Sequence, residues 1–190
     1  MRKLKLPEIN LKAFKSKFKK NLHYLSEGGF QQIYNRIDQL GIKKGVDELG
    51  IDKFIIQCAI LAAGSGAITG IGGVTSMIIG VPLDIINLIT QQFRVTLAIS
   101  YYNTGRYEIK FADFIKIVAA SLKVDTGMAI SKNLMEEVAE KLLLNIGSKT
   151  AERLVPVVGA VIGGSTNYLF IKRVADSLRN PEQTEKVIKI

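Results

Sequence analysis

Residues 54–83 have the sequence FIIQCAILAAGSGAITGIGGVTSMIIGVPL and contain no charged side chain. The run is longer than the roughly 20 residues with which a helix crosses the core of a bilayer. Pro82 and several glycines interrupt it, and an interior glycine costs a helix about 1 kcal/mol relative to alanine. The stretch therefore predicts two apolar helices joined by a glycine-rich bend near residues 70–75. The second of these helices is expected to extend from about residue 76 through residue 102.

A second uncharged segment, LVPVVGAVIGGSTNYLFI, occupies residues 154–171. Both segments contain glycines four residues apart, Gly66 with Gly70 and Gly159 with Gly163, which places each pair on one face of a helix. Small residues on one face allow two helix backbones to approach closely. Two interpretations remain open: an apolar hairpin that touches or enters lipid, and a tightly packed helix pair inside a soluble core.

The rest of the chain has the period of helices rather than of strands. Apolar residues recur every three or four positions in several windows, and no strand-like alternation or internal repeat occurs. The windows are residues 30–40, 84–102, 110–122 and 131–146. Gly28-Gly29 is expected to break the first helical pattern. Gly41, Gly45 and Gly50 are expected to interrupt helical structure in the region after it. The predicted fold is all-α, a compact multi-helix bundle around the two glycine-rich apolar segments.

The N-terminal residues form a basic amphipathic pattern. Lysines surround an apolar stripe that begins near residue 11, and Glu8 is the only acid among residues 1–20. The candidate membrane- or lipid-contact residues are Lys12, Phe14, Lys15, Lys17, Phe18, Lys19 and Lys20. Such a helix suits an anionic membrane surface, although it can equally pack its stripe on its own domain. We therefore divide the chain into a basic arm (1–25), a helical domain (26–180) and a polar tail (181–190).

The composition narrows the class of partner. The net charge of +9 attracts phosphate, on anionic lipid or on nucleic acid. Nucleic-acid binding is disfavoured because the basic residues are not interleaved with stacking aromatics and no recognition module is present. The single cysteine, Cys58, allows no internal disulfide, and no secretory signal follows the basic start, so a cytoplasmic location is expected.

Four polar residues, one inside the second apolar segment and three in the helix that continues from the first, are candidates for buried polar groups. They are Asp84, Gln91, Arg94 and Asn167. Asp84 follows Pro82 and suits the N-cap or first turn of a helix, where a carboxylate complements the helix dipole; a ligand contact is the alternative. Asn167 needs a hydrogen-bond partner if it is buried, and a backbone carbonyl or Gln91 would serve.

No catalytic, cofactor or metal site is predicted. Residues 63–70, with Asp84 further on, imitate a dinucleotide-binding fingerprint but lack the flanking strands that it requires. His23 is the only histidine and has no evident partner for a triad, while Cys58 among apolar neighbours suggests a buried, inert thiol. One histidine and one cysteine without metal-like spacing do not suggest zinc.

The order of the motifs resembles the EcsC family. The resemblance is carried by Ala62 to Gly73, Val81-Pro-Leu-Asp-Ile85, Tyr101-Tyr-Asn-Thr-Gly105 and Val155 to Asn167, and it covers roughly residues 30–180. It implies a bacterial protein of a family named for its link to an ABC-transporter operon, with no established catalytic residues.

These observations predict a non-enzymatic, membrane-associated protein. It would bind an anionic membrane surface or lipid through the basic arm and the glycine-rich helices, peripherally at the inner face of the cell membrane. The alternative is a soluble helical adaptor or regulator of an ABC transporter or another protein complex. A hydrolase or nucleotide-binding enzyme is a third hypothesis.

Overall fold

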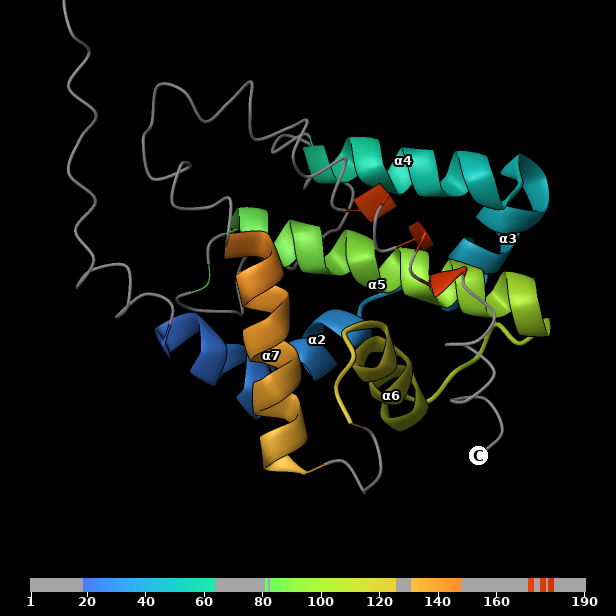
Figure 1. Ribbon diagram of the computed structural model, residues 1–190. Coiled ribbons are helices and arrows are strands. Elements are labelled where there is room, and N and C mark those ends of the chain that lie inside the picture. Colours follow the sequence, from blue (N-terminus) through green and yellow to red (C-terminus); the bar gives the residue numbers. More distant parts are fainter. Residues whose placement is uncertain are drawn as a thin grey trace, which may run out of the picture.

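The computed structural model describes residues 19–63, 81, 83–125 and 131–147, and six positions between 171 and 179. Every regular element in these residues is a helix, which confirms the predicted all-α class (Figure 1). Both glycine pairs, the predicted bend near residues 70–75 and most of the second uncharged segment lie outside the described residues.

The N-terminal part of the described chain contains a kink at the predicted place. The chain is helical from Lys19, passes through a π-helical turn, η1 (Leu25–Gly29), and continues as α2 (Phe30–Tyr34). Gly28 has a φ of +132°, in the region that favours glycine, and interrupts the helical path. Leu25 and Phe30 on either side of the kink are fully buried and fix it to the core.

Helices α3 (Gln39–Leu49) and α4 (Ile51–Ala63) follow, joined at Gly50. Gly50 has a φ of +79° and ends α3 as the sequence predicts. The expectation that Gly41 and Gly45 would also interrupt helical structure is wrong, because both lie inside α3. At Gly45 an added Cβ would lie 2.8 Å from the ring of Phe54, so this glycine allows α3 to approach α4.

Helix α5 (Leu83–Thr104) is the centre of the fold. It packs along α4, and Figure 1 shows the two helices side by side with opposite directions. Residues 86–100 are all buried except for half-buried Arg94. The helix ends close to the predicted residue 102, whereas the predicted start near residue 76 lies outside the described residues.

Helices α6 (Phe111–Ser121) and α7 (Lys132–Gly147) confirm the helices predicted at 110–122 and 131–146. An aromatic cluster joins α6 to the rest of the core: the Phe114 ring lies 4.7 Å from that of Phe93 and 4.9 Å from that of Tyr34, centroid to centroid. Offset and edge-on ring pairs add stability beyond the area that they bury. Helix α7 packs against η1 at the other side of the bundle.

Near the C-terminus, Ile171, Ala175 and Leu178 are buried. Arg179 donates to the carboxylate of Asp52 at 2.7 Å, which ties this region to the first turn of α4. None of the described helices combines the length and the apolar character needed to cross a bilayer.

Candidate functional site

The end of the basic arm nearest the domain is held by its apolar side. Lys19 and Lys20 are exposed, whereas Leu25 is buried and Leu22 packs against the core. The Lys20 ammonium lies 5.8 Å from the centroid of the exposed Tyr24 ring, within range of a weak cation–π contact. Here the apolar stripe packs on the protein's own core while the lysines face solvent. The other candidate lipid-contact residues, Lys12, Phe14, Lys15, Lys17 and Phe18, lie outside the described residues.

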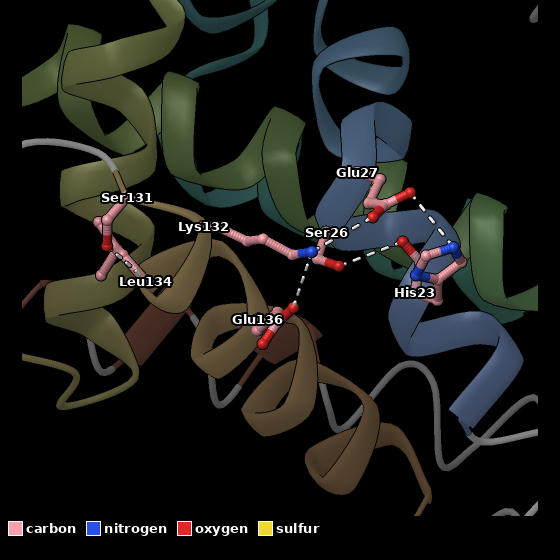
Figure 2. Close-up of polar contacts among 7 residues, drawn as sticks. All are labelled: His23, Ser26, Glu27, Ser131, Lys132, Leu134 and Glu136. Atoms are coloured by element: carbon pink, nitrogen blue, oxygen red, sulfur yellow. Dashed lines mark hydrogen bonds and ion pairs between the residues drawn. The ribbon is translucent and has the colours of Figure 1, made fainter.

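An exposed cluster of polar and charged side chains joins the arm to α7 (Figure 2). His23 Nε2 lies 3.2 Å from a carboxylate oxygen of Glu27, and Lys132 Nζ lies 3.5 Å from the other oxygen. Lys132 also lies 3.9 Å from Glu136. The spacing of four residues places His23 and Glu27 on one helix face and was the sequence signal for their contact. Exposed pairs of this kind contribute little individually, so the cluster adds little to the stability of the fold.

Ser26, His23 and Glu27 have the residue types of a hydrolytic triad, but their geometry is different. The Ser26 hydroxyl donates to the backbone carbonyl of His23 at 3.1 Å, and the imidazole nitrogen faces Glu27 (Figure 2). A nucleophilic hydroxyl must be hydrogen-bonded to the imidazole that removes its proton. The hydroxyl is committed to a local backbone contact, so these residues form a structural turn and not a triad.

A chain of hydrogen bonds crosses the buried face of α5. Asn87 Nδ2 donates to the Leu61 carbonyl of α4 at 2.9 Å, Gln91 Nε2 donates to Asn87 Oδ1 at 3.2 Å, and an Arg94 guanidinium nitrogen donates to Gln91 Oε1 at 3.0 Å. The structure thus brings together two of the predicted polar residues, Gln91 and Arg94. Asn87 was not among the predicted polar residues, although it lies one turn before Gln91 on the same helix face.

Arg94 and Cys58 share the interface between α4 and α5. The Arg94 guanidinium carbon lies 5.4 Å from the centroid of the Phe54 ring. Cys58 is fully buried, and burial raises the pKa of its thiol from 9.0 to about 11, with the positive charge of Arg94 acting weakly in the opposite direction. The thiol is therefore protonated near neutral pH and a poor nucleophile, as its apolar sequence neighbours predict.

Gln92 is the exception among the polar residues of α5. Its side chain is completely buried, and in the described part of the chain neither its amide nitrogen nor its amide oxygen has a hydrogen-bond partner. The hydroxyls of the nearby threonines are hydrogen-bonded within α5: Thr90 donates to the Ile86 carbonyl and Thr96 to the Gln92 carbonyl. No sequence signal distinguished Gln92 from Gln91.

The remaining predicted polar residues are placed only in part. Asp84 lies in the first turn of α5, where the sequence analysis expected it, but its side chain lies outside the described residues. Asn167, Gly66, Gly70, Gly159 and Gly163 also lie outside them.

Hydrogen bonds from the side chains of Tyr34 and Gln39 hold the loop before α6 at Ile109. The Tyr34 hydroxyl donates to the Ile109 carbonyl and accepts from Gln39 Nε2 at 3.0 Å, while Gln39 Oε1 accepts from the Ile109 amide at 3.0 Å. Burial is the main cause that raises the pKa of Tyr34. These hydrogen bonds give Tyr34 and Gln39 a structural role in holding the loop before α6.

The described residues hold no group of three His, Cys, Asp or Glu side chains that could bind a metal. Comparison of the chain with family models, curated proteins and solved structures found no match. The resemblance to the EcsC family therefore stays a prediction.

Proposed function

We propose that this protein binds reversibly to anionic membrane surfaces, at the cytoplasmic face of the membrane, without catalysing a reaction. One observation carries the proposal: Lys19 and Lys20 face solvent at the point where the basic arm is anchored by buried Leu25. Cations on the arm can therefore meet lipid headgroups while the domain stays folded.

Charge supplies the driving force. Residues 1–20 contain eight Lys or Arg side chains and one acid, Glu8. Each Lys or Arg near an anionic leaflet contributes about 1 kcal/mol, and the attraction fades within a Debye length. The arm thus supports reversible, salt-sensitive docking, with the glycine-rich segments as proposed apolar contacts.

A second candidate is a helical adaptor that serves an ABC transporter or another protein complex. The observation in its favour is the burial of α5, since residues 86–100 are enclosed by protein at every position except Arg94. Under this hypothesis the apolar segments complete the core, and the basic surface binds an acidic face of a partner protein.

Flotation with vesicles tests the proposal. The chain is mixed with phosphatidylcholine vesicles that contain or lack phosphatidylglycerol, at low and high salt. We expect binding only to the anionic vesicles and its loss at high salt. Absence of salt-sensitive binding to anionic vesicles contradicts the proposal.

A matched pair of variants locates the effect. Lys19→Gln with Lys20→Gln removes two arm charges, and Lys110→Gln with Lys123→Gln removes two exposed charges elsewhere. The arm pair should weaken binding roughly 30-fold, as expected from about 1 kcal/mol for each lysine. Equal losses in both pairs would contradict a role specific to the arm.

A further inference from the structure

After Lys53, helix α4 has no charged residue on any side, although it is buried on one side only. Its buried side consists of Ile51, Phe54, Ile55, Cys58, Ala59 and Ala62. On the opposite side Ile56 is 39% exposed and Ile60 is 59% exposed, with the uncharged Gln57 between them. A surface helix normally carries charged or polar residues along its solvent side, so this run of uncharged positions is unusual.

Helix α7 shows how this protein builds an ordinary surface helix. Its exposed side carries charged residues, among them Lys132, Glu137 and Glu140. The exposed side of α4 has no charged residue after Lys53, and the sequence stays uncharged as far as Leu83. One exposed isoleucine would need no explanation, but two within a turn on a charge-free face define a local apolar surface.

A cation borders this surface at one end. Lys53 is exposed on the same side of α4, one turn before Gln57 and two turns before Ile60. The acid next to Lys53 is Asp52, whose carboxylate is paired with Arg179. Lysine side chains can keep their ammonium at headgroup level while neighbouring apolar groups enter the acyl region.

We infer that the outer face of α4, formed by Lys53, Ile56, Gln57 and Ile60, enters the headgroup–acyl boundary of an anionic membrane. The inference rests on the proposed function and adds the part of the domain that contacts lipid once the basic arm has attracted it. Lys53 complements anionic headgroups. Two isoleucine side chains are far smaller than the roughly 800 Å² per partner of a stable protein interface, which disfavours a second copy as the occupant.

A polarity-sensitive fluorophore at position 60 tests this placement. The Ile60→Cys variant is labelled on its new thiol with a nitrobenzoxadiazole probe, since Cys58 is buried, with its pKa raised, and does not compete. The control is Glu140→Cys, labelled in the same way at an exposed site on α7. Anionic vesicles are prepared with and without nitroxide-labelled acyl chains.

We expect the probe at position 60 to shift to the blue and to be quenched by the nitroxides, and the probe at position 140 to do neither. Protein that cosediments with vesicles while the probe at position 60 stays in water overturns this inference and leaves the proposed function standing. No cosedimentation at all overturns both. A blue shift without vesicles that grows with protein concentration identifies a second copy as the occupant and also overturns it.

An unlabelled variant gives a second, independent measurement. Ile60→Gln should lower the affinity for anionic vesicles roughly 5- to 10-fold, as expected from the apolar surface removed. The salt dependence should stay that of the wild type, because the arm is unchanged. Unchanged affinity in this variant would count against insertion of α4.

Discussion

Replacement of Gln92 by methionine should stabilise the protein. The Gln92 side chain is completely buried on α5, and among the described residues its amide has no hydrogen-bond partner. An unsatisfied buried polar group costs about 1–3 kcal/mol. Methionine has a similar length and shape and no amide to desolvate, so Gln92→Met should raise the free energy of unfolding by about 1–2 kcal/mol.

The same substitution one residue earlier should have the opposite effect. The Gln91 amide donates to Asn87 and accepts from Arg94 in an equally buried position. Gln91→Met would leave the half-buried Arg94 guanidinium without this acceptor, and hydrogen bonds to charged groups contribute about 1.5–3 kcal/mol. We therefore expect Gln91→Met to lower the free energy of unfolding by about 2 kcal/mol.

Urea unfolding followed by circular dichroism measures both variants against the wild type. A change of 1 kcal/mol corresponds to about 2–4 °C in the melting temperature of a domain of this size, so thermal scans provide a second readout. If Gln92→Met destabilises the protein as much as Gln91→Met does, the amide has a partner and the reasoning about α5 is wrong.

Three further predictions concern packing, pH and the loop before α6. Gly45→Ala should fail to give the gain of about 1 kcal/mol that alanine normally brings inside a helix, because the new methyl group would press on the buried Phe54 ring. A variant that is more stable than the wild type by that amount in urea unfolding would contradict this close contact. Burial raises the pKa of Cys58 from 9.0 to about 11, so the stability that this thiol contributes is fully present below pH 9. As the pH rises from 9 to 11, the free energy of unfolding should fall by about 2–3 kcal/mol because of this thiol. The free energy of unfolding of Cys58→Ala should not show this fall. Tyr34→Phe removes the hydroxyl that donates to the Ile109 carbonyl and should lower the free energy of unfolding by about 1 kcal/mol. Backbone amides of residues 106–110 should then exchange hydrogen faster, and unchanged exchange would show that Tyr34 does not hold this loop.

Much of the described fold follows from the sequence through apolar periodicity, but the helix predicted at 30–40 ends at Tyr34 and α3 was not predicted. The patterns at 110–122 and 131–146 predicted α6 and α7 within a residue or two, because each helix buries a single stripe. The break at Gly28-Gly29 was also predicted, since a φ of +132° at Gly28 requires glycine. Gly45 was misjudged because its role is contact with a neighbouring helix, which composition alone does not reveal.

The candidate site was less accessible to sequence reasoning. Gln91 and Arg94 were singled out as polar residues within an apolar stretch, and their contact follows from their spacing along one helix. The different environments of Gln91 and Gln92 depend on which elements pack around α5, and this is tertiary information. The pairing of Glu27 with Lys132 joins residues that are distant in the sequence and has the same origin.

Fractionation of cells that produce the full chain tests the central claim most directly. The membrane pellet is washed first with concentrated salt and then extracted with detergent, and the protein is quantified in the soluble, salt-released and detergent-released pools. Salt-sensitive docking predicts that the protein sediments with membranes at low ionic strength and is released by the salt wash. Recovery entirely in the soluble pool, or release only by detergent, would contradict the account.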